Sequence, residues 1–286
     1  MTVLQNKIDF AVVLSVTKAN PNGDPLNGNR PRQNYDGYGE ISDVAIKRKI
    51  RNRLMDMGEK VFVQSNDKRT DDFKSLRERA ENNETLNKIL KDKNKSDEMF
   101  AEAACKEWID VRAFGQVFAF KGSKTKGVSV GVRGPVSIHT AISVDPIDTH
   151  SMQITKSVNT EPGDKKGSDT MGMKHRVDFG VYVFYGSINT QLAEKTGFTR
   201  EDAEKIKEAL ITLFENDASS ARPEGSMEVH KVYWWEHNSK MGQYSSAKVH
   251  RTLKIEKNVD TPKQFSDYTL NLEKLEGLRV EIFDGK

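Results

Sequence analysis

The chain has 286 residues, of which 36% are hydrophobic and 30% are charged, and its formal net charge is +3. This length suits one large domain or two small ones, and the low apolar share predicts a large surface relative to the core, as in a domain with protruding parts. The single cysteine, Cys105, excludes a disulfide framework and a zinc site built from several thiolates. We see no secretory signal and no apolar run of transmembrane length, and therefore expect a soluble cytoplasmic protein without a membrane partner.

The first predicted element is a central strand over residues 7–17, which are mostly β-branched and apolar. A loop from Asn20 to Arg32 follows, with the sequence NPNGDPLNGNRPR. Its Pro, Gly and Asn residues exclude a helix or a central strand and predict tight turns. The loop ends in Arg30 and Arg32, which we expect it to direct at an anionic partner.

A helix is predicted from Ser42 to Met57, with Ser42 as the N-cap and Gly58 just beyond the C-terminus. Its apolar residues repeat at helical spacing and form the buried stripe, while Lys47, Arg48 and Arg51 lie on the other faces. No Asp or Glu occurs between Val44 and Leu54. A solvated helix face normally mixes both signs of charge, so this pattern favours a surface that follows a phosphate backbone.

Residues 60–110 are dense in charged residues and thin in large apolar ones, which predicts a helical insertion outside the main core. From Arg112 to Val144 there is no Asp or Glu, although the chain holds 42 of them. Two strands are predicted here, over 117–121 and 128–132, joined by a basic turn. The cations of this region are a second indication of an anionic partner, and those we select are Lys121, Lys124, Lys126 and Arg133.

Residues 137–175 alternate β-branched and polar residues, which predicts a long hairpin with a mobile tip. A core strand over 177–185, a helix over 199–216 and a strand over 228–235 follow, with edge strands over 247–257 and 278–283. Without the insertions, the order is β-α-β-β-α-β, the ferredoxin-like pattern of RNA-recognition domains. The predicted fold class is therefore α+β.

Several catalytic and cofactor signatures are absent from the sequence: the Walker and dinucleotide fingerprints and H-E-x-x-H. We expect no cofactor. Asp145, Asp148 and His150 are close enough in sequence to suggest a metal site, but a polar hairpin turn explains them better. The run Tyr233–Trp235 could stack on bases, although three consecutive aromatic residues on a strand fit the core or a subunit interface better.

The first strand, the segments N-P-N-G-D-P and G-N-R-P-R, and the basic helix together resemble the backbone subunit of type I CRISPR Cascade complexes, most closely that of subtype I-C. The resemblance implies an RNA-recognition-like palm, a helical fingers insertion and a protruding thumb hairpin. It also implies that several copies stack head to tail into a helical filament along a guide RNA, beside other Cascade subunits. Such a subunit holds the guide and supports its pairing with target DNA, without catalysis.

The resemblance divides the chain into five parts: palm at 1–59, fingers at 60–110, palm strands at 111–136, thumb at 137–175 and the second half of the palm at 176–286. Met152 and Ile154 are the expected wedge residues of the thumb. The expected RNA-binding residues are Asn20, Asn22, Arg30, Arg32, Lys47, Arg48, Arg51, Lys121, Lys124, Lys126, Arg133 and Lys156. We expect the loop 20–32 and the region Gly115–Gly134 to form opposite walls of one groove.

Two other functions stay open at this point. The first is a metal-dependent ribonuclease that cuts target RNA with a loop aspartate, as in type III backbone relatives. Its candidate residues are Asp24, Asp36, Asp145 and Asp148. The second is a structural assembly protein without nucleic acid, which the cations lacking nearby acids in the sequence argue against.

Overall fold

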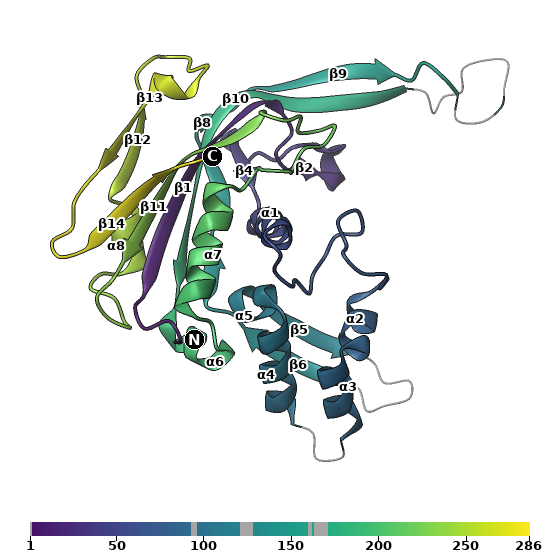
Figure 1. Ribbon diagram of the computed structural model, residues 1–286. Coiled ribbons are helices and arrows are strands. Elements are labelled where there is room, and N and C mark those ends of the chain that lie inside the picture. Colours follow the sequence, from purple (N-terminus) through teal and green to yellow (C-terminus); the bar gives the residue numbers. More distant parts are fainter. Residues whose placement is uncertain (1, 93–95, 121–127, 160–161, 163–170) are drawn as a thin grey trace.

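The computed structural model describes residues 2–92, 96–120, 128–159, 162 and 171–286. Its main feature is an eight-stranded antiparallel sheet in the order β14-β11-β1-β10-β8-β4, with β7 and β9 also paired to β10 (Figure 1). An α+β protein built on an antiparallel sheet is thus confirmed. The strands are β1 (Ile8–Ala19), β4 (Tyr38–Ile41), β7 (Val136–Ile138), β8 (Ala141–Pro146), β9 (Thr149–Thr155), β10 (Met171–Ile188), β11 (Met227–Glu236) and β14 (Arg279–Asp284).

Strand β1 lies in the middle of the sheet, as its apolar sequence predicted. It pairs with β10 from Ile8↔Ile188 to Ala19↔Val177, and with β11 on its other side. Successive side chains of a strand point to opposite faces. Phe10 and Val12 enter one core, while Ala11 and Val13 enter another. Both faces of the sheet are therefore covered, which explains why this strand is apolar almost throughout.

Two helices, α1 (Asp43–Asp56) and α7 (Arg200–Ile211), cover one face of the sheet. The Ser42 hydroxyl accepts from the Ala45 N–H at 3.3 Å, and Thr199 forms a capping box with Asp202, so both predicted N-caps are confirmed. A short helix that we did not predict, α6 (Thr190–Thr196), precedes α7. None of the helices in the described ranges is long and apolar enough to cross a membrane.

The C-terminal segment covers the opposite face. The single strand predicted over 247–257 is wrong in its first half, which forms the helix α8 (Ser246–His250). The reason is a cap: the Ser245 hydroxyl accepts from the Lys248 N–H at 3.3 Å. The second half, β12 (Leu253–Lys257), pairs with β13 (Tyr268–Leu272) in a separate sheet. The predicted edge strand at 278–283 is confirmed as β14, at the edge beside β11.

A second unit, which we call the helical unit, comprises the described residues 60–92, 96–120 and 128–133 and has a core of its own. Its helices are α2 (Leu76–Asn82), α3 (Glu84–Lys91), α4 (Asp97–Glu107) and α5 (Ile109–Phe114). The predicted strands at 117–121 and 128–132 form β5 (Gly115–Phe120) and β6 (Val128–Arg133), but their expected place in the main sheet is wrong. They form a two-stranded sheet of their own, because Phe118 packs against Phe62 and Phe100 in this unit.

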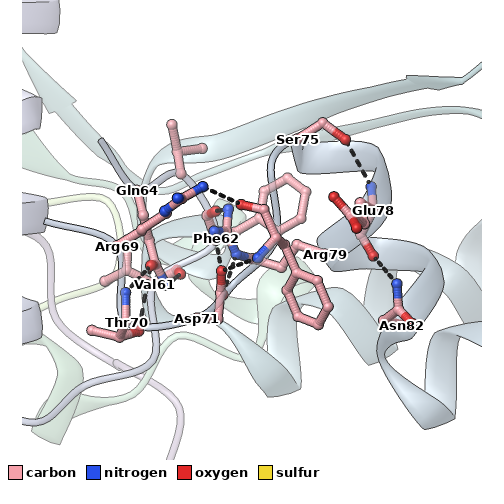
Figure 2. Close-up of polar contacts among 12 residues, drawn as sticks. Val61, Phe62, Gln64, Arg69, Thr70, Asp71, Ser75, Glu78, Arg79 and Asn82 are labelled. Carbon is pink, nitrogen blue, oxygen red and sulfur yellow. Dashed lines mark hydrogen bonds and ion pairs between the residues drawn. The ribbon is translucent and has the colours of Figure 1, made fainter. Parts of the chain in front are cut away.

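A buried arginine organises the start of the helical unit (Figure 2). The Arg79 guanidinium donates to both carboxylate oxygens of Asp71 at 2.7 Å, and to the Phe62 carbonyl at 2.8 Å. Nearby, Gln64 accepts from the Thr70 N–H at 2.8 Å. These side-chain contacts hold residues 61–71, which contain no helix or strand, in a defined path between α1 and α2.

Two arginine–aspartate pairs join the helical unit to the rest of the protein. Arg51 of α1 contacts Asp110 of α5, with 2.9 Å between Nε and Oδ2, and Arg112 of α5 binds both oxygens of Asp202 in α7. Asp110 also accepts from the backbone N–H groups of Phe62 and Val63, at 2.7 and 3.1 Å. Paired and hydrogen-bonded in this way, the two buried carboxylates fix α5 against α1 and α7.

The predicted hairpin is present, but it is shorter than expected. Only β9 and residues 171–177 of β10 extend beyond the sheet, and we call this projection the arm (Figure 1). Strands β7 and β8 pair with β10 within the sheet itself, so residues 136–146 do not belong to the projection. Strand β10 continues from the arm into the sheet and contains the predicted core strand 177–185. Most of the predicted mobile tip lies outside the described residues.

Candidate nucleic-acid interface

A groove of about 260 Å³ lies where four segments meet: residues 21–23, α1, residues 65–68 and residues 217–222. We call it the basic groove. Four cations line it, and two carboxylates accompany them, so its lining carries an excess of positive charge. The charged lining residues are Arg48, Lys49, Lys68, Arg222, Asp67 and Asp217. This composition suits an anionic ligand such as a phosphate backbone.

Lys49 is the most deeply buried of these cations, with 5% of its surface exposed. Its ammonium pairs with Asp217 and lies 5.4 Å from the centre of the Phe214 ring. Burial lowers the pKa of Lys49 to about 8, although the Asp217 carboxylate acts in the opposite direction. A side chain in this state is charged at neutral pH and loses its charge at mildly alkaline pH.

Two further groove cations are held by backbone or carboxylate oxygens. The Arg48 guanidinium donates to the Val63 carbonyl at 2.7 Å, and burial lowers its pKa. Arg222 lies 3.6 Å from Asp217, although its Nε has no hydrogen-bond partner among the described residues. Such partners position the two guanidinium groups while leaving donor capacity for a ligand, because each guanidinium has five N–H groups.

The loop 20–32 folds into a small hairpin of β2 (Gly23–Asp24), the 3₁₀ turn η1 (Pro25–Asn27) and β3 (Arg30–Pro31). Asn20 donates to the Asn29 carbonyl at 2.7 Å, and Asn22 accepts from the Ser42 N–H at 2.9 Å. Both predicted asparagines thus have partners within the fold, where they shape the loop and tie it to the start of α1. Their binding to RNA stays a prediction.

The two arginines of this loop differ in environment. Arg30 is exposed, whereas Arg32 is half-buried and lies 3.5 Å from Asp24. Arg30 therefore presents its charge to solvent, while the contact of either arginine with an anionic partner stays a prediction.

The expectation that the cations of α1 lack acidic partners is wrong. Lys47 pairs with Asp43 at 3.0 Å within the helix, Lys49 pairs with Asp217, and Arg51 pairs with Asp110. Asp217 and Asp110 come from distant parts of the chain, so the local sequence could not show them. Arg51 in particular lies over the Phe114 ring, where α1 contacts the helical unit. This position differs from the RNA contact that was expected for it.

The predicted second wall of the groove is not beside the first. Strands β5 and β6 lie with α3 and α4, at the end of the molecule far from β2 (Figure 1). Arg133, at the end of β6, is exposed there. Lys121, Lys124 and Lys126 lie outside the described residues. The walls that face the loop 20–32 across the basic groove come instead from residues 65–68 and 217–222.

On the arm, Met152 pairs with Lys174 and Ile154 pairs with Gly172. Alternate residues of a strand point to the same face, so the two expected wedge residues share one face. Ile154 is 47% exposed. The other face carries Met171 and Met173, exposed to 63% and 55%, which sequence reasoning missed. The expected RNA contact Lys156 follows β9 and is exposed.

The aspartates considered for catalysis lie in different surroundings. Asp24 accepts from the Leu26 N–H at 3.1 Å and caps η1. Asp145 lies 3.4 Å from Lys257, and Asp36 and Asp148 are exposed. Across the described ranges, no three His, Cys, Asp or Glu side chains come close enough to hold a metal ion. Asp145, Asp148 and His150 therefore form no such group.

Lys49, Lys68 and Arg222 are groove residues that we did not select from the sequence. Lys68 and Arg222 occur in ordinary polar segments, and only folding brings them to α1. Lys49 did carry a signal, because it lies three residues after the buried Ile46 and next to the buried Ile50. A cation at such a position on a helix is directed toward the covered side rather than toward solvent.

Comparisons with known proteins identify the family. The family model described as CRISPR-associated protein Cas7 matches residues 6–273. A CRISPR-associated protein Cas7 of Haloferax volcanii is 26% identical over 234 residues, which cover 77% of this chain and 67% of the relative. A similar solved chain is entitled "CRISPR RNA-guided surveillance complex, pre-nicking"; it is 15% identical, the match covers 80% of this chain and 78% of that chain, and the TM-score is 0.47. Another is entitled "CRISPR RNA-guided surveillance complex"; it is 16% identical, the match covers 80% of this chain and 68% of that chain, and the TM-score is 0.44. Since the family model spans nearly all of the sequence, the chain belongs to the Cas7 family of CRISPR-associated proteins.

Proposed function

We propose that this chain is a non-catalytic backbone subunit of a CRISPR RNA-guided complex and that it holds the guide RNA by its phosphates in the basic groove. The observation that carries the proposal is the groove itself, where four cations from three separate segments surround a space large enough for a phosphate. A guide must be held whatever its sequence. Contacts to phosphates meet this need, while base pairing supplies the specificity.

In the proposal, the main sheet with α1 and α7 is an RNA-recognition-like palm. The central strands follow the order β11-β1-β10-β8, with α1 between β1 and β8 in the chain and α7 between β10 and β11. This is the β-α-β-β-α-β succession of the ferredoxin-like pattern. The helical unit would then be the fingers and the arm the thumb, with the boundaries found here in place of those expected from the sequence.

The arm supports the second part of the proposal, that copies of the chain assemble along one guide and open it to target DNA. Exposed apolar residues on both faces of a projecting hairpin suit insertion between bases, since each face can lie against a base. Copies stacked head to tail would place their arms at regular intervals along the guide, beside the other subunits of the complex.

The groove is tested by the double variant Lys68→Gln/Arg222→Gln. We expect its affinity for a labelled single-stranded RNA of mixed sequence to fall by about tenfold or more at physiological salt. The slope of log K against log salt should also become shallower by about 1.4, because each lost phosphate contact removes about 0.7 for a single strand. Fluorescence anisotropy over a salt series measures both quantities.

Lys254→Gln is the matched control, because Lys254 is an exposed cation on β12, outside the groove. This variant should bind RNA as the wild type does. If the double variant kept the affinity and salt slope of the wild type while remaining folded, the groove would not be the RNA site.

Lys49 predicts a pH dependence of RNA binding. Because its pKa is lowered to about 8, the side chain is mostly charged at pH 7 and mostly neutral at pH 9 in the free protein. We therefore expect RNA to bind more weakly at pH 9 than at pH 7, with a midpoint above 8 because a bound phosphate favours the charged lysine. Lys49→Arg should flatten this profile, since arginine stays charged. A wild-type affinity that is constant from pH 7 to 9 would remove Lys49 from the contact set.

A further inference from the structure

Lys18, near the end of β1, has an unusual backbone conformation. Its φ angle is 51°, in the left-handed region that favours glycine. The other non-glycine residues with positive φ in the described ranges are Asn29 and Asn216. Asparagine tolerates this region well, whereas a lysine there carries an energetic cost. A residue held in such a conformation justifies a search for a function of its side chain.

The conformation turns Lys18 out of the core. Phe10, Val12, Leu14 and Val16 alternate along β1 and point into the core beneath α1 and α7. Regular alternation would direct Lys18 into the same core. Instead, Ala19 joins that core and Lys18 is exposed. The left-handed residue therefore switches the face that the strand presents.

The backbone alone does not require lysine at this position. Glycine would adopt the same φ without strain, and asparagine with little. Any benefit that offsets the cost must therefore come from the lysine side chain. In the described part of the chain, no carboxylate lies within ion-pair distance of its ammonium, so an internal salt bridge does not supply that benefit.

The position of Lys18 connects two parts of the proposed RNA surface. The lining of the basic groove begins three residues later, at Pro21, which is at most about 11 Å along the chain. The flanking residues Thr17 and Asn20 donate backbone N–H groups to the carbonyls of Ser226 and Ala221, at 2.8 and 2.9 Å, beside the groove. On the other side, Ala19 pairs with Val177 at the root of the arm.

We propose that Lys18 is an RNA-backbone contact at the end of the basic groove nearest the arm, and that its strained backbone serves to aim the ammonium there. The inference rests on the proposed RNA-binding function and adds to it a residue outside the groove lining. It predicts that stability and binding change in opposite directions when Lys18 is replaced.

The test compares Lys18→Gly, Lys18→Asn and Lys18→Arg in the full-length chain. Lys18→Gly should raise Tm by about 1–3 °C, because the relief of left-handed strain exceeds the added flexibility of the unfolded chain. Both Lys18→Gly and Lys18→Asn should weaken binding of the labelled RNA by about three- to tenfold and reduce the salt slope by about 0.7. Lys18→Arg should retain the affinity and slope of the wild type, and Lys254→Asn serves as the control for losing an exposed lysine elsewhere.

The outcomes separate this inference from the proposed function. A lower RNA affinity and a shallower salt slope in Lys18→Asn, with wild-type values of both in Lys18→Arg, support the contact between Lys18 and the RNA backbone. If the wild type binds RNA and Lys18→Asn binds with the same slope, Lys18 only shapes the strand, and the inference fails while the proposed function stands. A decrease of Tm in Lys18→Gly would overturn the strain argument. A wild-type chain that binds no RNA would overturn both proposals.

Discussion

Replacing Asp110 with alanine is expected to lower the free energy of unfolding by about 3–5 kcal/mol, because it leaves a buried positive charge without its partner. Asp110 is fully buried and lies 2.9 Å from Arg51. It also accepts the backbone N–H groups of Phe62 and Val63, which would lose their hydrogen bonds. Equilibrium unfolding in urea, followed by circular dichroism, measures the change.

Limited proteolysis should show where the damage occurs. Residues 61–71 follow a path set by side-chain contacts, so we expect new cleavage there before the main sheet unfolds. Asp72→Ala is the matched control, because Asp72 is exposed and its loss should change stability by less than about 0.5 kcal/mol. If Asp110→Ala proved as stable as this control, Asp110 would not fix the joint between α1 and α5.

Replacing Asp202 with asparagine is expected to lower the free energy of unfolding by about 2–4 kcal/mol at pH 7. Asp202 binds Arg112 through both oxygens, at 2.9 and 2.7 Å, and accepts the Thr199 N–H at 2.9 Å in the capping box of α7. The substitution weakens the charge pair and part of the cap together. The free energy of unfolding at several pH values gives both the size of the effect and its origin.

The pH dependence follows from the direction of the pKa shift. Burial by itself would raise the pKa of Asp202, but hydrogen bonds from Arg112 and Thr199 lower it below its usual value. The carboxylate therefore stabilises the fold above the pKa of an unfolded aspartate, about 4, and this stabilisation is lost as the pH falls through the lower folded-state pKa.

The gap between wild type and Asp202→Asn should consequently be widest near pH 7 and narrow below about pH 4. Glu208→Gln, at an exposed position of the same helix, should show a small effect at every pH. A gap that stayed constant down to low pH would mean that the lost geometry of the cap, rather than the charge of Asp202, causes the change.

The groove shows why the basic helix α1 predicted only some of the residues that line it. The charges of α1 were visible in the sequence, and Arg48 lines the groove, while its contact with RNA stays a prediction. Arg51 was selected on the same grounds, yet it pairs with Asp110, which is far from it in the sequence. A local pattern shows that cations are present, but not which of them a distant carboxylate neutralises.

The sequence by itself determined the elements whose signals are local. The apolar run of β1, the Ser42 and Thr199 caps and the turn-rich loop after β1 all depend on neighbouring residues, and each was found where it was predicted. The family resemblance had the same source, since the motifs N-P-N-G-D-P and G-N-R-P-R are continuous in the chain.

Only the tertiary structure decided which surfaces these elements share. Strands β5 and β6 lie in the helical unit and not in the main sheet, because Phe118 packs against Phe62 and Phe100 there. The tertiary structure also brought Lys68 and Arg222 to α1. The cause is the same in each case: packing and charge pairing join residues that are far apart in the chain, and no window of sequence contains both partners.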